Sequence, residues 1–154
     1  MDDDKSKPHL VNREKQHAVV VREKVPMNQL PQFFGRAFGQ TMGVAQAQGR
    51  HIVGPPFAVY FGMPTDTVDV AAGFPVDAPV EATDGTEPYE LPGGQAVEML
   101  HIGSYESLSA GYHKLTEWMT EQDLTSADVM WESYLNDPGD NPEAAQTLVT
   151  WPVS

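Results

Sequence analysis

The sequence predicts an α+β fold made of two copies of a strand–helix–strand–strand (βαββ) unit. Two β-branched, strand-like patterns follow one helical pattern in each half, and a Pro- and acid-rich seam at residues 76–94 separates the halves. Such units bury one sheet face under a helix. We therefore expect pseudo-twofold symmetry and a curved antiparallel sheet with two helices on one face.

Length and composition suit one domain. The chain has 154 residues, of which 40% are hydrophobic. We expect a disordered or tag-derived N-terminus at residues 1–15, in which "MDDDKSK" resembles a protease-cleavage linker. A single domain should follow at residues 16–154, with halves at about 16–76 and 94–153.

The first half begins with the β-branched run "HAVVVR", which predicts a strand at residues 17–22. Apolar residues near the 3.6-residue period then predict a helix over 28–48, which Asn28 can cap and Gly49 can end. Strands are expected at 57–62 and 67–76. The helix contains a GxxxGxxxG series at Gly35, Gly39 and Gly43. Each glycine lowers helix stability by about 1 kcal/mol relative to alanine. Either the helix packs tightly against the sheet or another subunit, or it is loose and frayed.

The second half repeats the order with a strand at 95–102, a helix that Ser104 caps, and strands at 129–135 and 147–151. The helix should bury a stripe of five residues: Tyr105, Leu108, Tyr112, Leu115 and Met119. In the strand over 129–135, Met130, Glu132 and Tyr134 should share one face. A charge at Glu132 is costly there unless something pairs with it.

Charge and composition exclude several classes of protein. The formal net charge is −13, which repels phosphate backbones, so we expect no direct nucleic-acid partner. The chain has no cysteine and no apolar run near the ~18 residues that a membrane span needs, so we expect a cytoplasmic protein without a membrane partner. The five histidines show no ligand spacing, and no phosphate loop or nucleophile elbow is present. We therefore expect no metal and no cofactor.

Four motifs in the second half carry a resemblance to a known family: "LPGG" at 91–94, "HIGSYESLSAGYHKLTEWM" at 101–119, "MWESYLNDP" at 130–138 and "TWPV" at 150–153. They resemble the GyrI-like (gyrase-inhibitor-like) effector-binding family, whose members occur alone or in AraC-type and MerR-type transcription regulators. The first half fits more loosely, through "GPPFAVYFG" at 54–62. Ser104 stands where the family usually has Pro. The resemblance implies a duplicated βαββ fold with a ligand cleft between the halves, and Glu132 matches the ligand-facing glutamate of a "WE-x-Y" motif.

Five residues are candidates for a ligand site: Glu132, Tyr134, Tyr60, Tyr112 and Trp118. Glu132 can serve as countercharge to a cation or pair with an Arg at a cleft rim. Each tyrosine is either a ligand contact or an ordinary core aromatic. An acidic field concentrates cations, and aromatic rings stack on them.

The first hypothesis for function is a stand-alone effector-binding or sequestering domain for small aromatic or lipophilic, cationic molecules. Such a domain would take part in multidrug binding and in transcription regulation. Its partners are the ligand and either a second copy of the chain, as a homodimer, or a separate regulator chain. The alternative is a GyrI-like hydrolase of electrophilic small molecules, in which Glu132 activates water and Tyr134 or Tyr60 donates a proton. A third hypothesis, a protein–protein inhibitor that acts in the manner of gyrase inhibition, rests on the resemblance alone.

Overall fold

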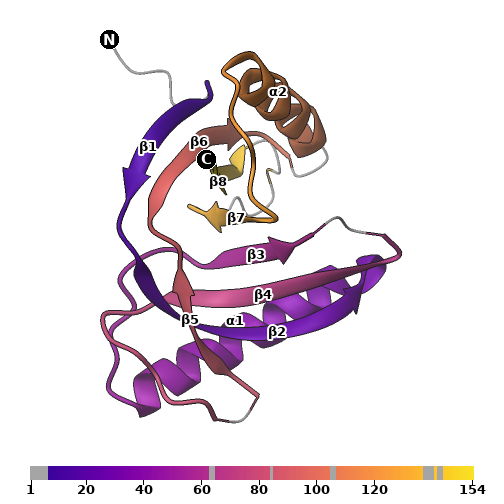
Figure 1. Ribbon diagram of the computed structural model, residues 1–154. Coiled ribbons are helices and arrows are strands. Elements are labelled where there is room, and N and C mark those ends of the chain that lie inside the picture. Colours follow the sequence, from indigo (N-terminus) through magenta and orange to yellow (C-terminus); the bar gives the residue numbers. More distant parts are fainter. Residues whose placement is uncertain (1–6, 63–64, 84, 105–106, 137–140, 142–143) are drawn as a thin grey trace. The chain divides into compact units, whose positions relative to one another are not determined.

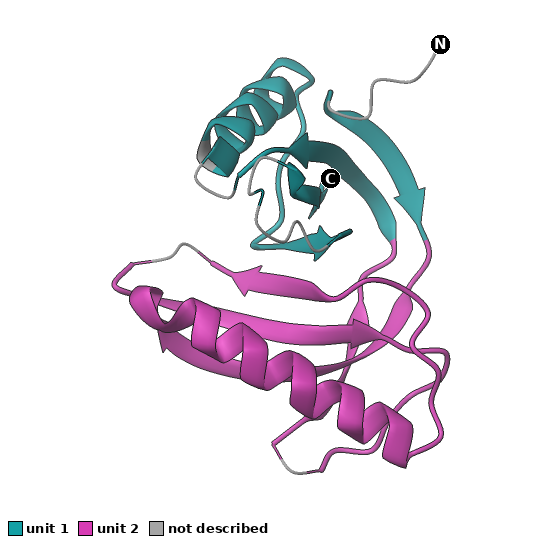
Figure 2. Ribbon diagram, turned by 180° about the vertical axis from the view of Figure 1, so that it is seen from behind, with its two compact units in different colours: residues 1–13, 94–154 teal, residues 14–93 magenta. Residues whose placement is uncertain are grey.

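The computed structural model describes residues 7–62, 65–83, 85–104, 107–136, 141 and 144–154. Two compact units divide the chain. Unit 1 comprises residues 1–13 and 94–154, and unit 2 comprises residues 14–93 (Figure 2).

Unit 2 is a four-stranded antiparallel sheet with one long helix (Figure 1). Its elements are β2 (Gln16–Pro26), the short 3-10 helix η1 (Met27–Gln29), α1 (Leu30–Ala47), β3 (Phe57–Phe61), β4 (Thr67–Pro75) and β5 (Glu87–Leu91). The strand order in this unit is β3-β4-β2-β5. α1 buries Phe33, Ala37, Thr41, Val44 and Ala45 against the sheet.

Unit 1 is also a four-stranded sheet with one helix. Its elements are β1 (His9–Arg13), β6 (Gly94–Ile102), α2 (Leu108–Glu121), β7 (Val129–Tyr134) and β8 (Gln146–Pro152). The strand order is β7-β8-β6-β1, and all neighbours are antiparallel. α2 places Leu108, Leu115 and Met119 in the core, as its apolar stripe predicts. Tyr105, the first residue of that stripe, lies outside the described residues.

The predicted α+β class and the repeated βαββ order are confirmed, as β2-α1-β3-β4 and β6-α2-β7-β8. The structure adds one strand to each unit. β1 pairs with β6 and β5 pairs with β2, so each sheet gains an outer strand from segments in which the sequence predicts none. Both strands are five residues long and only one of their ten residues, Leu91, is buried, so their apolar alternation is too weak to predict.

Two helix starts differ slightly from the prediction. α1 begins at Leu30 after η1, and Asn28 lies in that preceding turn. α2 begins at Leu108, and the Oγ of Ser104 accepts a hydrogen bond from the N–H of Ser107 at 3.3 Å, just before the helix. Helix ends are the least regular part of a helix, so shifts of this size are ordinary. Neither described α-helix is long and apolar enough to cross a membrane.

The glycines of unit 2 play two different roles. Gly73 in β4 permits a close approach, because a Cβ there would lie 1.8 Å from the carbonyl oxygen of Val19. At Gly35, Gly39 and Gly43 no close approach requires a glycine. An added Cβ would meet nothing within 4 Å at any of the three. Of the alternatives for this series, tight packing against the sheet is therefore wrong, because its residues face away from the sheet.

Candidate functional site

Strand β7 of unit 1 carries a buried carboxylate. Glu132 is only 7% exposed, although carboxylates are rarely buried unless they are paired. Alternation along β7 puts Met130, Glu132 and Tyr134 on one face of the sheet. In the antiparallel register Glu132 lies opposite Val149 of β8, so its neighbour in the sheet is an apolar side chain.

Two phenol hydroxyls donate hydrogen bonds to this carboxylate. The hydroxyl of Tyr134 donates to Oε1 of Glu132 at 2.9 Å, and the hydroxyl of Tyr112 donates to Oε2. Tyr134 comes from the same strand two residues on, whereas Tyr112 comes from α2. The helix thus covers the carboxylate and is joined to it by a charge-assisted contact, a stronger class of hydrogen bond than a neutral pair.

Soft and aromatic groups surround the carboxylate. The Tyr112 hydroxyl lies 3.8 Å from the sulfur of Met130. The Tyr112 ring meets the Trp151 ring edge to face, with centroids 6.5 Å apart. Trp151 is fixed in turn, because its indole N–H donates to the carbonyl of Ala127 at 2.9 Å. The result is one buried acid in contact with two phenols, one of which packs in turn against a thioether and an indole. Such a lining suits a lipophilic cation, since aromatic faces and a carboxylate both attract positive charge.

Thr147 and Trp151 belong to this face, although neither is among the five candidates from the sequence; Trp151 lies in the TWPV motif, and Thr147 lies in none of the motifs. Thr147 pairs with Tyr134 across β7 and β8, is fully buried, and its hydroxyl has no hydrogen-bond partner among the described residues. Alternation within β8 is the available signal, because Thr147, Val149 and Trp151 occur at every second position.

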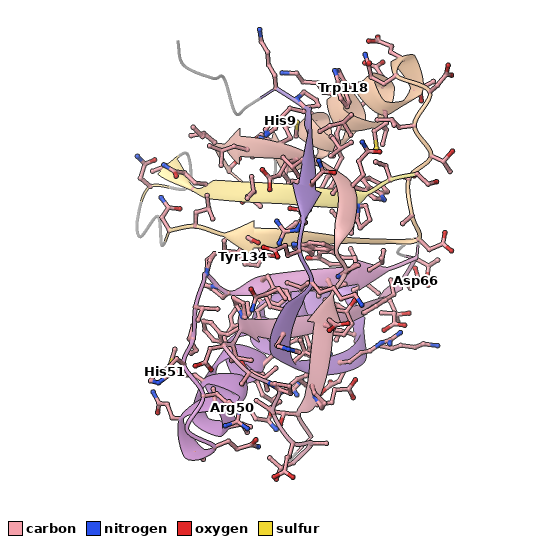
Figure 3. All side chains as sticks on the ribbon, turned by 60° about the vertical axis from the view of Figure 1, so that its left-hand side comes forward. His9, Arg50, His51, Asp66, Trp118 and Tyr134 are labelled. Atoms are coloured by element: carbon pink, nitrogen blue, oxygen red, sulfur yellow. The ribbon has the colours of Figure 1, made fainter. Side chains whose placement is uncertain are left out.

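The structure does not bring Trp118 to the carboxylate. Trp118 follows Tyr112 by six positions, about 240° around the helix, so the two side chains leave α2 on different sides. Figure 3 shows Trp118 on α2, well away from Tyr134 at the end of β7.

Tyr60 belongs to unit 2. It lies on β3 opposite Val70 of β4, on the face that α1 covers. Any part it plays beside Glu132 of unit 1 stays a prediction.

His101 makes a hydrogen bond to a residue close to it in the sequence. Nε2 of His101 lies 2.9 Å from Oγ of Ser107, at the start of α2. Among the described residues, no group of three His, Asp or Glu side chains is placed to hold a metal ion.

Unit 2 carries a different charged cluster at its sheet surface. The guanidinium nitrogens Nε and Nη2 of Arg22 donate to the carboxylate of Asp69, at 3.0 and 2.9 Å. The Arg22 guanidinium also lies 3.8 Å from the centroid of the Phe61 ring. The hydrogen bonds from Arg22 hold the pKa of Asp69 below its usual value. Arg22 and Asp69 satisfy each other's charge and hydrogen bonds, and both are partly exposed. We therefore assign this ion pair a role in the stability of the fold and not in ligand binding.

Comparison with known proteins agrees with this fold. The model of the GyrI-like small molecule binding domain matches residues 6–154, so the chain belongs to the GyrI-like family. No curated protein matches the sequence.

Solved structures share the architecture at low sequence identity. The C-terminal domain of EcmrR is 19% identical with a TM-score of 0.84, and the match covers 96% of this chain and 97% of that domain. Against the EcmrR chain in a complex with DNA, the same match covers 57% of that chain. A hydrolase encoded by lin2189 from Listeria innocua is 15% identical with a TM-score of 0.70, covering 97% of this chain and 92% of that one. SAV2435 bound to tetraphenylphosphonium is 12% identical with a TM-score of 0.66, covering 96% and 94%. At these identities the matches show the fold alone.

Proposed function

We propose that the chain binds small lipophilic, cationic aromatic molecules, with Glu132 of unit 1 as the countercharge. The observation that carries the proposal is the buried carboxylate that accepts hydrogen bonds from Tyr112 and Tyr134. Two donors favour the ionised form of a carboxyl group, so the unliganded interior can keep an anion ready for a cation. Membership of a small-molecule-binding family supports this reading, as does the tetraphenylphosphonium that SAV2435 binds.

Entry of a ligand requires a local rearrangement. Glu132 is covered, and Tyr112 on α2 holds one of its oxygens. A cation that reaches Oε2 must replace the Tyr112 hydroxyl there, and the Tyr112 ring is then available to stack on the ligand. The ligand-binding equilibrium therefore includes the energy of moving this side chain, and affinity reflects the difference between the two states.

The test is a titration of wild-type protein and the variant Glu132→Gln with two ligands. Tetraphenylphosphonium is the cation, and triphenylphosphine oxide is an uncharged aromatic compound of similar chemistry. Gln keeps the shape of the side chain but removes the charge. A charge-assisted contact contributes about 1.5–3 kcal/mol, so the affinity for the cation should fall about tenfold or more.

The uncharged ligand should lose much less affinity in the same variant. The Glu132→Gln variant should still fold, because the substitution removes a buried charge and introduces no new one. Equal losses for both ligands, or a variant that does not fold, would show that Glu132 has a structural role only.

Hydrolysis of an electrophilic small molecule is the second candidate function. It is favoured by the Tyr134 hydroxyl, which lies 2.9 Å from the Glu132 carboxylate and so places an acid beside a general base. In this reaction Glu132 takes a proton from water, the water oxygen bonds to the electrophilic carbon, and Tyr134 protonates the leaving atom. Mass spectrometry separates the two functions, since hydrolysis adds the mass of one water to the ligand and binding returns it unchanged.

A further inference from the structure

The strongest feature that the binding proposal leaves unexplained is the buried hydroxyl of Thr147 in β8. Thr147 is 0% exposed, and its Oγ1 has no hydrogen-bond partner among the described residues. A buried polar group without a partner costs free energy, so such groups are rare in folded proteins and need an explanation. Thr41, which is equally buried, has its partner, because its hydroxyl donates to the carbonyl of Ala37 at 2.8 Å.

Thr147 lies on the same side of the sheet as Glu132. Trp151, four residues further along β8, contacts the ring of Tyr112 of α2. Side chains four residues apart in a strand share a face, so the Thr147 hydroxyl also belongs to the face that α2 covers. The direct neighbour of Thr147 in β7 is Tyr134. Glu132 is then a diagonal neighbour of Thr147, at the separation of about 7–8 Å that such pairs have.

The neighbours of Thr147 in the sheet use their polar atoms in other contacts. The hydroxyl of Tyr134 donates to the Glu132 carboxylate at 2.9 Å. On the other side Thr147 is paired with His101 of β6, whose Nε2 lies 2.9 Å from Oγ of Ser107 at the start of α2. A hydroxyl can both donate and accept a hydrogen bond. The capacity of the Thr147 hydroxyl is therefore available to a polar group that enters with a ligand.

We propose that Thr147 is a second polar anchor of the Glu132 site, and that the site selects cationic aromatic ligands that also carry a hydrogen-bonding group, such as a hydroxyl or an amide. This inference rests on the proposed binding function. Glu132 binds the positive charge, and the Thr147 hydroxyl binds the polar group on another part of the same ligand. A ligand that supplies the missing partner recovers the free energy lost by burying the hydroxyl, whereas an apolar ligand of the same shape does not.

A matched pair of ligands tests the inference. Both are tetraphenylphosphonium cations in which one phenyl ring carries a para substituent, either hydroxymethyl or ethyl. The two substituents have nearly the same size, and only the hydroxymethyl group forms hydrogen bonds. The ratio of the two dissociation constants, measured by calorimetric titration, therefore reports the hydrogen bond separately from the charge and the aromatic area that the two ligands share.

Three variants assign the hydrogen bond to one residue. Thr147→Val removes the hydroxyl and nearly keeps the shape of the side chain. It should shift the ratio about fivefold towards the ethyl compound, as expected for the loss of one neutral hydrogen bond. Thr147→Ser keeps the hydroxyl and should keep the wild-type ratio. Thr150→Val is the matched control and should also keep that ratio. Thr150 is equally buried, and its Oγ1 also has no partner among the residues that the structure describes, but it points to the opposite face of β8.

An unchanged ratio in Thr147→Val, or an equal shift in Thr150→Val, would overturn the inference. Failure of the proposed function gives a different result. If both cations bind the wild type and lose affinity together in Glu132→Gln, the binding function stands whatever the ratio shows. If neither cation binds the wild type, the proposed function fails and this inference fails with it.

Discussion

The carboxylate of Glu132 is the residue on which the account of ligand binding depends. Removing an ion from water costs several kcal/mol, and each charge-assisted hydrogen bond returns about 1.5–3 kcal/mol. Tyr112 and Tyr134 together therefore offset much of the cost of burial. A cation in place of one phenol offsets it further, which is the physical reason to expect selectivity for positive charge.

The first prediction at this scale concerns Tyr112→Phe. The change removes a donor to a buried anion and should lower the free energy of unfolding by about 1–3 kcal/mol. It should also raise affinity for tetraphenylphosphonium, because the ligand no longer competes with the hydroxyl while the ring stays available for stacking. Denaturant melts and calorimetric titration measure the two effects. Tyr89→Phe, in unit 2, is the control and should leave cation affinity unchanged; weaker cation binding in Tyr112→Phe would contradict the competition.

A second prediction concerns Thr147→Val. The Thr147 hydroxyl is fully buried without a partner among the described residues, and valine has nearly the same shape. Removing an unsatisfied hydroxyl should raise the free energy of unfolding by about 1 kcal/mol or more. Chemical denaturation of both proteins checks the sign. A destabilised variant would mean that the hydroxyl contributes a hydrogen bond in solution.

At the scale of elements, strand alternation is the most informative signal in the sequence. It predicts that Glu132 and Tyr134 share one face, and β7 has that arrangement. The contact from Tyr112 is harder to predict, because the position of α2 over the sheet depends on packing between elements distant in sequence. The Gly35–Gly43 series misleads for a related reason. Spacing shows that the three glycines share a face, but it does not show which way the face points.

The third prediction concerns the ion pair between Arg22 of β2 and Asp69 of β4. The Arg22 hydrogen bonds lower the pKa of Asp69, so this carboxylate contributes stability above its unfolded pKa and loses the contribution as pH falls through the folded pKa. Both side chains are partly exposed, so the contribution should stay within about 1 kcal/mol.

Unfolding free energies measured between about pH 6 and about pH 3 check this prediction. Asp69→Asn should flatten the acid side of the profile relative to the wild type, and Arg22→Gln should flatten it to a similar extent. A wild-type slope in Arg22→Gln would show that the guanidinium is not the cause of the shift.

At the scale of the whole molecule, the repeated βαββ plan is predictable from the sequence because duplication displays the same order of elements twice. The sheet to which each outer strand adds is not predictable from the local sequence pattern. β1 completes the sheet of unit 1 and β5 completes that of unit 2, and both pairings join segments far apart in the chain. Short strands with few buried residues leave little hydrophobic signal, so their partners are defined only by the folded structure.

The fourth prediction follows from net charge. With −13 overall, the protein should show no measurable affinity for DNA, even near about 50 mM salt where phosphate contacts are strongest. Gel retardation with micromolar protein is the measurement. A retarded band that disappears as salt rises would reveal a basic contact surface and contradict the charge argument.

The structure of the protein in complex with tetraphenylphosphonium tests the central claim most directly. The account predicts that the phosphonium lies beside the Glu132 carboxylate, with the Tyr112 hydroxyl displaced from Oε2 and the Tyr112 or Trp151 ring within about 6 Å of the cation. A cation bound elsewhere, with both phenol contacts to Glu132 intact, would contradict it.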